Sequence, residues 1–437
     1  MDTSTGAPPG PRLPDLPLDD LAGAAVRGGV EGWTDDELID AVGAVLAEPR
    51  EGPADSFVLH APLELAARAR LLAATPTALR PLARLRILSI AARFRTYEPL
   101  GDRNDEPGET TPDEAADPVA ALGAAVAGGD LAAVDRTACA LLAAAPRPAE
   151  VTAGLAPSTV ARTSAAGHAP ILLASLADGS PDAARWLSQI RPLSRELARR
   201  PAWRIGWPDR QPPALTGTTP DPDALFRALA DPPRLGIPGS TFIHPTMHQV
   251  DAMDENGGAT AAAVLGSMAG PEVPVTPATA RAVTRIAALS MVRDTIDHAP
   301  YGWTHCLTMP QAVLAIAPEV EAGGGAALSV AATHVLGFRA ALATATLDRT
   351  DPLLRPVDDH DRRRRRGRLV AEAARRHDAH IAKYLLAVQH AADRDPAAEE
   401  VYLAAGEHLL AVWDDLGPDP DDLLAAEAAA TRSTATA

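Results

Sequence analysis

Twelve histidines and a single lysine are the residues of this chain whose types suit metal chemistry. Lys383 is the only lysine, so arginine supplies the other 39 of the 40 basic residues. A solvated cationic position accepts either residue. A site that needs a neutral amine accepts only lysine, because arginine does not deprotonate in proteins. Lys383 is therefore either a surface residue kept by chance or a buried amine with a chemical role.

Lys383 lies three residues after His380 in the segment Asp378-Ala-His380-Ile-Ala-Lys383. In a helix this spacing places both side chains on one face, which Leu386 continues. A lysine on such a face must pair with a carboxylate, lose its proton, or react with carbon dioxide to form a carbamate, because a buried charge is costly. A carbamate is an anionic oxygen ligand for a divalent metal. The alternative is a lysine that extends to solvent or forms a simple ion pair.

Three further histidines, His60, His168 and His298, occur in the tripeptide His-Ala-Pro. Proline favours the first turn of a helix, so each histidine is predicted at or just before an N-cap. The positive end of the helix dipole disfavours protonation there, which keeps the ring neutral, as a metal ligand must be. The similar apolar sequences that follow His60 and His168 suggest an internal pseudo-repeat. The alternative for each is a hydrogen-bonded, partly buried ring.

His305 has a related context, before a helix that Thr308 is predicted to cap and Pro310 to enter. His244 and His248 are four residues apart and precede several carboxylates, so they either form a second metal site or line a pocket. The remaining histidines are expected to be ordinary helix residues: His334, His360, His377, His390 and His408.

The elements that must position these residues are helices. Apolar residues recur every three to four positions nearly throughout, and no alternating strand pattern occurs, which predicts an all-α fold with one large multi-helix domain and long loops. We expect the domain to span 21–431, between a disordered segment at 1–20 and a disordered tail at 432–437. Residues 200–240 are proline-rich and predict a loop or lid packed over the body.

Composition excludes several classes of function. A formal net charge of -17 argues against nucleic-acid and anionic-membrane partners. The arginine run 362–366 is expected to begin a solvated helix and to pair with carboxylates. The apolar runs are too short to span a membrane, and two cysteines fit a reducing compartment, so we expect a cytoplasmic protein. Glycine-rich motifs for Rossmann-type dinucleotide binding or phosphate loops are missing.

Four short motifs, in this order, resemble the questin oxidase-like family, and they spread over most of the chain, from about 55 to 412. They are Phe57-Val-Leu-His60-Ala-Pro-Leu-Glu-Leu, Gly167-His168-Ala-Pro-Ile-Leu, Trp303-Thr-His305-Cys-Leu-Thr308 and Asp378-Ala-His380-Ile-Ala-Lys383. The resemblance implies a flavin-independent helical oxygenase of secondary metabolism. Such an enzyme oxidises or cleaves a ring of an aromatic polyketide such as an anthraquinone, as a ring-cleaving dioxygenase or a Baeyer–Villiger-type oxidase.

The resemblance also implies a non-haem Fe(II) centre held by four histidines and a carboxylated lysine. Carried over, the ligands are His60, His168, His305, His380 and the carbamate of Lys383, with His298 as the alternative to His305. Dioxygen and a small aromatic molecule are the implied substrates, and NADPH is the external reductant where one is needed. We expect Asp378 to orient a ligand and Tyr301 to line the pocket, and assign both to the catalytic centre.

Two other functions stay open at this stage. A metal-dependent hydrolase also uses carbamylated lysine, bridging two metals, and His244 with His248 would then hold the second ion. A helical scaffold would use its histidines for packing alone and would bind no metal. The oligomeric state does not follow from the sequence.

Overall fold

The chain folds into α-helices joined by turns and short 3-10 segments, and the described residues contain no β-strand. The all-α class predicted from the periodicity is confirmed. The computed structural model describes residues 12–14, 16–50, 57–97, 116–144, 146–161, 164–177, 186–187, 189–199, 221–232, 275–296, 300–320 and 325–415.

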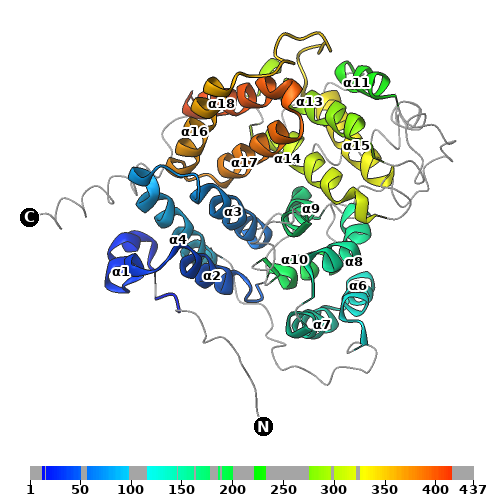
Figure 1. Ribbon diagram of the computed structural model, residues 1–437. Helices are drawn as coiled ribbons and strands as arrows, with labels where there is room; N and C mark the ends of the chain where they lie inside the picture. The colour runs from blue at the N-terminus through cyan, green and yellow to red at the C-terminus, as the bar shows by residue number, and fades with distance from the viewer. Residues whose placement is uncertain are drawn as a thin grey trace, which may run out of the picture.

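The helices are shown in Figure 1 and have the following bounds: α1 Leu21–Arg27, α2 Asp35–Leu46, α3 Phe57–Leu72, α4 Arg80–Tyr97, α6 Pro118–Gly128, α7 Leu131–Ala144, α8 Pro148–Ala161, α9 Ser164–Ala177, α10 Ile190–Ala198, α11 Pro222–Ala230, α13 Pro277–Arg293, α14 Pro300–Ile316, α15 Gly325–Leu342, α16 Asp359–Arg375, α17 Ala379–Arg394 and α18 Glu399–Asp415. Short 3-10 helices complete the set: η1 Leu18–Asp20, η2 Val30–Gly32, η3 Thr77–Leu79, η5 Ala317–Glu319 and η7 Pro396–Ala398.

Four helices, α3, α9, α14 and α17, form a ring in which each helix contacts the next. The other helices cover this ring from outside: α2 and α4 pack on α3, α8 and α10 on α9, α13 and α15 on α14, and α16 and α18 on α17. Buried apolar residues from Leu13 to Trp413 form one continuous core cluster. The inner faces of the ring helices are therefore largely buried, and a polar side chain buried there needs a partner.

The predicted disorder of 1–20 is wrong for the described part of that segment. Leu13 and Leu16 are buried in the core, and residues 18–20 form η1. Arg95 of α4 also donates a hydrogen bond of 3.1 Å to the carbonyl of Pro14. The two leucines contact the core, which offsets the proline-rich composition that predicts disorder. Residues 1–11 and the tail at 432–437 lie outside the described part of the chain.

The proline-rich stretch 200–240 contains a helix where a loop is predicted. In α11, the side chain of Asp221 accepts the backbone N–H of Asp223, and Pro222 takes the first helical position. Leu225, Phe226 and Leu229 are buried, and the helix packs on α13. Aspartate followed by proline is a helix start, which the high proline content of the surrounding sequence concealed. Residues 200–220 and 233–240 lie outside the described residues.

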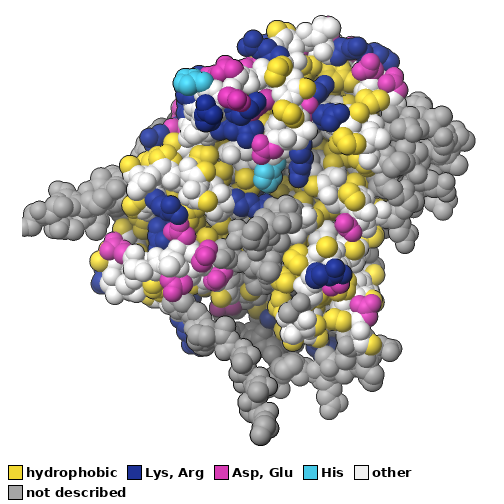
Figure 2. Space-filling view, in the orientation of Figure 1, with side chains coloured by type: hydrophobic (Ala, Val, Ile, Leu, Met, Phe, Trp, Pro, Cys, Tyr) yellow, Lys and Arg dark blue, Asp and Glu magenta, His cyan; other side chains and the backbone are white. Residues whose placement is uncertain are grey.

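The arginine run 362–366 begins α16 and pairs with carboxylates of α18, as predicted. Arg362 and Arg366 bind Glu399, and Arg365 binds Glu400 and Glu407. Figure 2 shows basic and acidic side chains intermixed over this part of the surface. Arg365 is buried rather than solvated, because three of its nitrogens donate to carboxylates. No helix in the described ranges combines the length and the hydropathy that crossing a bilayer requires.

Candidate metal centre

Each helix of the ring contributes one histidine to a common point. His60 comes from α3, His168 from α9, His305 from α14 and His380 from α17, and Lys383 follows His380 by one turn. The Nε2 atoms of His60 and His380 are 3.4 Å apart, and Lys383 Nζ lies 3.3 Å from His168 Nε2. The ring centroid of His305 lies 4.9 Å from that of His168 and 5.6 Å from that of His380. All five side chains named as ligands by the family resemblance thus lie together.

The histidines occupy helix interiors rather than positions before an N-cap. His60 is the fourth residue of α3, and His305 lies well inside α14. The predicted start of a helix at Thr308 is wrong, because the Thr308 hydroxyl donates to the carbonyl of Thr304, 3.0 Å away, instead of capping a new helix. Pro310 lies inside α14. A helix dipole can act on His60 and His380, which lie in the first turns of α3 and α17, but the neutrality of His305 in the interior of α14 needs another cause.

Gly167 sets the approach of α9 to α14 immediately before His168. Its φ of 81° is in the left-handed region, which glycine adopts at little cost. A Cβ at this position would lie 2.5 Å from Cγ of Met309. Glycine is therefore required both by the backbone conformation and by the contact with α14, and it allows His168 to reach the centre.

Asp378 orients His380 from the start of α17. Its carboxylate caps the helix by accepting the backbone N–H of His380 at 2.7 Å, and Oδ1 also lies 2.8 Å from His380 Nδ1. Burial alone would raise the pKa of the Asp378 carboxyl, but the charge of His380 and the hydrogen bonds from it lower this pKa well below its usual range. An ionised carboxylate at Nδ1 places the proton there and leaves the Nε2 lone pair facing His60.

A buried arginine fixes the corner between α16 and α17 on which Asp378 lies. Arg68 of α3 donates to the carbonyls of Ala373, Arg376 and His377 at 3.0, 3.0 and 2.6 Å. Its Nε also donates to Glu64, which is fully buried, at 2.7 Å. One side chain therefore ties the helix that carries His60 to the turn that precedes His380.

The electrostatics of the centre favour neutral nitrogen donors. Burial, followed by the nearby charge of Lys383, lowers the pKa values of His60 and His168 well below the usual value. Burial also lowers the pKa values of His305 and His380. Burial lowers the pKa of Lys383 to about 7, against the opposing charges of Asp378 and Glu64. Burial therefore favours neutral imidazoles at this centre and brings the neutral amine of Lys383 within reach near neutral pH.

The residues present fit a divalent metal. Two nitrogens that are each about 2.1 Å from one metal ion are separated by about 3.0–3.4 Å, the range that includes the His60–His380 spacing. The candidate ligand atoms of His60, His168 and His380 all lie within 4.8 Å of one another. Among the described residues, neither ring nitrogen of His305 has a hydrogen-bond partner, although the side chain is only 1% exposed. Buried polar atoms in this condition call for additional partners, and a cation satisfies the one nitrogen of the neutral ring that has a lone pair.

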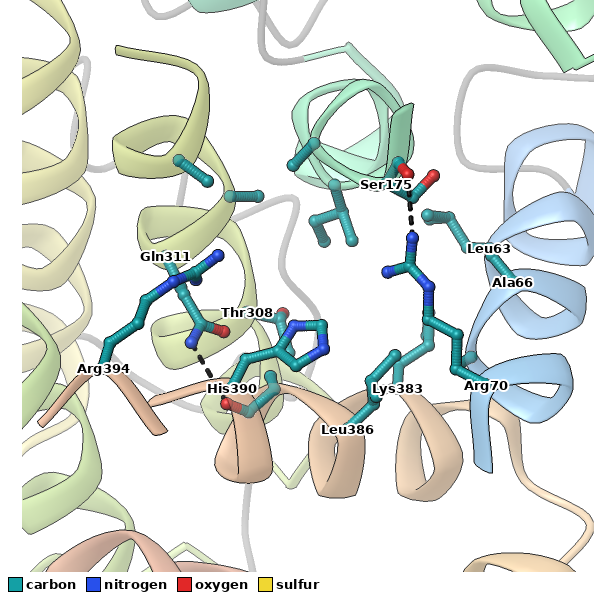
Figure 3. A pocket seen from close by; sticks show the side chains of 16 residues that line it. Leu63, Ala66, Arg70, Ser175, Thr308, Gln311, Lys383, Leu386, His390 and Arg394 are labelled. Atoms are coloured by element: carbon teal, nitrogen blue, oxygen red, sulfur yellow. Dashed lines mark hydrogen bonds between the residues drawn. The ribbon is translucent and has the colours of Figure 1, made fainter. Parts of the chain in front are cut away.

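A pocket leads to the centre between the same four helices. Its cavity volume is about 70 Å³, and the cavity opens to solvent. Lys383 contributes to its lining. Figure 3 shows Lys383 and Leu386 along one side and Ser175 across from them, with Arg70 beside Lys383 and extended toward Ser175. A molecule as small as carbon dioxide can therefore approach the amine of Lys383 through this pocket.

The sequence did not point to several residues around the centre. His334 of α15 is fully buried beside His305, and burial lowers its pKa to about 3. His390 and Arg394 line the pocket. The sequence does contain a pattern for the latter two, because they continue the face of α17 that begins with His380 and Lys383. Arg70, from α3, also lines the pocket and had no such pattern.

Other sequence predictions fall outside what the structure describes. The backbone of Tyr301 belongs to α14, but its side chain lies outside the described residues, as do His244, His248 and His298. The pocket-lining role of Tyr301, the second metal site and the alternative to His305 therefore stay predictions.

Comparisons with protein-family models, with curated proteins and with solved structures found no match. The resemblance to the questin oxidase-like family thus rests on the four sequence motifs.

Proposed function

We propose that this protein is a non-haem Fe(II)-dependent oxygenase that oxidises or cleaves a ring of an aromatic polyketide. The observation that supports this function best is the convergence of His60, His168, His305 and His380 on Lys383, which also lines a pocket. Together, four imidazoles and one oxygen ligand suit Fe(II), and the family resemblance favours iron over manganese or zinc.

Lys383 supplies the oxygen ligand in this proposal. Its neutral amine attacks carbon dioxide, a nitrogen–carbon bond forms, and one proton is released, which leaves an anionic carbamate. A pKa of about 7 provides the neutral amine at physiological pH, and exposure to the pocket provides access for carbon dioxide. Arginine cannot undergo this reaction, because it stays protonated. The single lysine of the chain therefore occupies the position where this chemistry is needed.

The surrounding residues hold and shield this ligand set. Asp378 keeps the proton of His380 on Nδ1, and Arg68 fixes the turn before it. The four histidines would hold iron together with the carbamate, and iron so bound supplies the capacity to activate dioxygen. The alanine-rich walls of the pocket give the approach to Lys383 a mainly apolar surface. Both cysteines are free, which supports a reducing, cytoplasmic location.

Oxygen uptake by the iron-loaded protein tests the proposal. Protein reconstituted anaerobically with Fe(II) and bicarbonate is mixed with a panel of hydroxylated anthraquinones, with and without NADPH, and dioxygen consumption is followed beside product mass. We expect consumption that needs iron and is abolished in His168→Ala, and a product heavier by oxygen. Turnover of the panel without dioxygen would replace the proposal with a hydrolase, and a protein that binds no metal would favour a scaffold.

A further inference from the structure

The pocket that Lys383 lines is too narrow for an aromatic ring system. Its cavity of about 70 Å³ lies between α3, α9, α14 and α17, and Figure 3 shows side chains of these helices around it. A single water molecule needs about 10–15 Å³ of such space, whereas sites for drug-sized ligands have about 300–1,000 Å³. The pocket therefore has room for molecules as small as carbon dioxide and serves a smaller guest than the aromatic substrate.

Two hydrogen bonds between helices hold the pocket at this width. Arg70 of α3 donates to the carbonyl of Ser175 on α9 at 2.8 Å, and Gln311 of α14 donates to the carbonyl of Ala387 on α17 at 3.1 Å (Figure 3). Because packed helices resist separation, the pocket does not widen easily for a larger guest. The apolar part of the lining comes from all four helices: Leu63, Ala67, Ile171, Ala174, Ala312 and Ala387.

Lys383 is the reactive group beside this passage. Its side chain is only 6% exposed, so bulk solvent reaches little of it. Its Nζ lies 3.3 Å from Nε2 of His168, at the point where the four histidines converge. A reactant for this amine must therefore pass between helices, and the pocket is an opening that the described residues leave beside it.

We propose that this pocket is the passage by which carbon dioxide reaches Lys383, and that its width controls how fast the carbamate forms. The lone pair of the amine attacks the carbon of carbon dioxide, a nitrogen–carbon bond forms, and one carbon–oxygen π bond becomes the negative charge of the carbamate. The nitrogen then releases one proton to solvent, and the step consumes no oxidant or reductant. The proposal rests on the carbamate of the proposed function and adds the route and its control.

A passage controls the rate of a reaction but not its equilibrium. The final fraction of carbamate depends on the amine and on the concentration of carbon dioxide, which a narrower passage leaves unchanged. A side chain that fills the pocket should therefore slow carbamate formation and leave its final extent as in the wild type. A side chain that distorts the centre would instead change the final extent.

Two substitutions in α14 fill the passage at different depths. Ala312 is buried in the lining and Ala315 is partly exposed, so Ala312→Leu narrows the interior and Ala315→Leu narrows the region nearer solvent. Ala69→Leu is the matched control, because Ala69 is a partly buried alanine of α3 outside the described lining.

The rate of carbamate formation in the full-length protein tests the passage. Protein freed of metal and carbon dioxide is mixed with ¹³C-bicarbonate and carbonic anhydrase, the carbamate is fixed by alkylation at timed intervals, and the labelled peptide is measured by mass. Lys383 is the only lysine, so digestion separates its label from that of the N-terminal amine. We expect Ala312→Leu to react at least about tenfold more slowly than the wild type, because carbon dioxide must then wait for a local opening of the packed helices. Ala315→Leu should also react more slowly, and Ala69→Leu should match the wild type.

The outcomes separate the passage from the proposed function. A wild-type rate in Ala312→Leu, or a lower final extent at a wild-type rate, would overturn the passage and leave the oxygenase untouched. A wild type that forms no carbamate, with or without Fe(II), would refute the carbamate ligand and the passage together. The melting temperature of each variant shows that it is folded, and Ala315→Leu, in the partly exposed part of the lining, decides the result if Ala312→Leu does not fold.

Discussion

Oδ1 of Asp378 lies 2.8 Å from Nδ1 of His380, while Nε2 of the same ring lies 3.4 Å from Nε2 of His60. The carboxylate thereby determines which nitrogen of His380 carries the proton and which presents a lone pair to the centre. Two residues of sequence separate the cap of α17 from the ring that it orients. A single aspartate therefore both starts the helix and prepares a metal ligand.

Asp378→Asn should weaken metal binding far more than it weakens the fold. Asparagine caps a helix about as well as aspartate, but it lacks the negative charge that favours a proton on Nδ1. We expect Fe(II) affinity to fall about 10- to 100-fold, measured by competition with a chelator. Asp358→Asn, which changes the equivalent cap of α16, is the control and should retain wild-type affinity. A similar loss in both variants would mean that Asp378 acts through the helix alone.

Gly167→Ala should destabilise the protein and disturb His168. The φ of 81° costs about 1–3 kcal/mol for a residue with a side chain, and the new Cβ would overlap Met309. Urea unfolding measures the loss, and Met309→Ala in the same chain should relieve only the contact. In Gly367→Ala, by contrast, the new Cβ meets open space within helix α16, so this variant should gain up to about 1 kcal/mol. If Gly167→Ala is as stable as wild type, the contact between α9 and α14 does not require glycine at position 167.

Arg68→Met should remove the connection between α3 and the start of α17. The variant loses three hydrogen bonds to backbone carbonyls and one partner of the buried Glu64. We expect the free energy of unfolding to fall by about 3–5 kcal/mol, because breaking a buried ion pair leaves groups without compensation. Arg375→Met removes an exposed pair with Glu372 and should cost less than about 1 kcal/mol. Denaturant titration of both variants measures the two losses in the free energy of unfolding. Equal losses would contradict the role of Arg68 in connecting α3 to the start of α17.

Lys383 should make the stability of the metal-free protein depend on alkaline pH. Burial lowers its pKa to about 7 in the folded chain, whereas an unfolded lysine titrates near about 10.4. Between these values the unfolded chain binds one more proton, so the free energy of unfolding should rise by about 1.4 kcal/mol per pH unit. We would compare wild type with Lys383→Met by urea unfolding at pH 7.5–9.5 in buffer free of metal and carbon dioxide. If the difference in the free energy of unfolding between the two proteins does not change with pH, Lys383 stays protonated in the folded chain over this range.

The helical fold could be predicted from the sequence because its causes are local. Periodic apolar positions do not depend on distant parts of the chain, although they did not reveal the break between α16 and α17 before Asp378. The order of helices around the ring is a tertiary property, which no local pattern encodes. Leu13 and Leu16 illustrate the limit, since their proline-rich context predicts disorder while their burial depends on a core formed elsewhere.

The residues of the candidate centre could be predicted from the sequence, but their positions relative to one another could not. The solitary Lys383, three residues after His380, drew attention to one helix, and the family resemblance supplied the other three histidines. The predicted contexts of His60 and His305 were wrong, because proline and threonine that would start a helix also occur inside one. The role of Arg68 could not be predicted, since the carbonyls that it binds are about three hundred residues away.

Iron stoichiometry in single-residue variants tests the convergence of these five side chains on one metal most directly. The protein and its variants His60→Ala and Lys383→Arg are reconstituted with Fe(II) and bicarbonate without oxygen, freed of unbound metal, and analysed for iron per chain. We expect one iron in the wild type and a large loss in both variants, which retain the wild-type circular dichroism spectrum. One iron per chain in both variants would contradict the account.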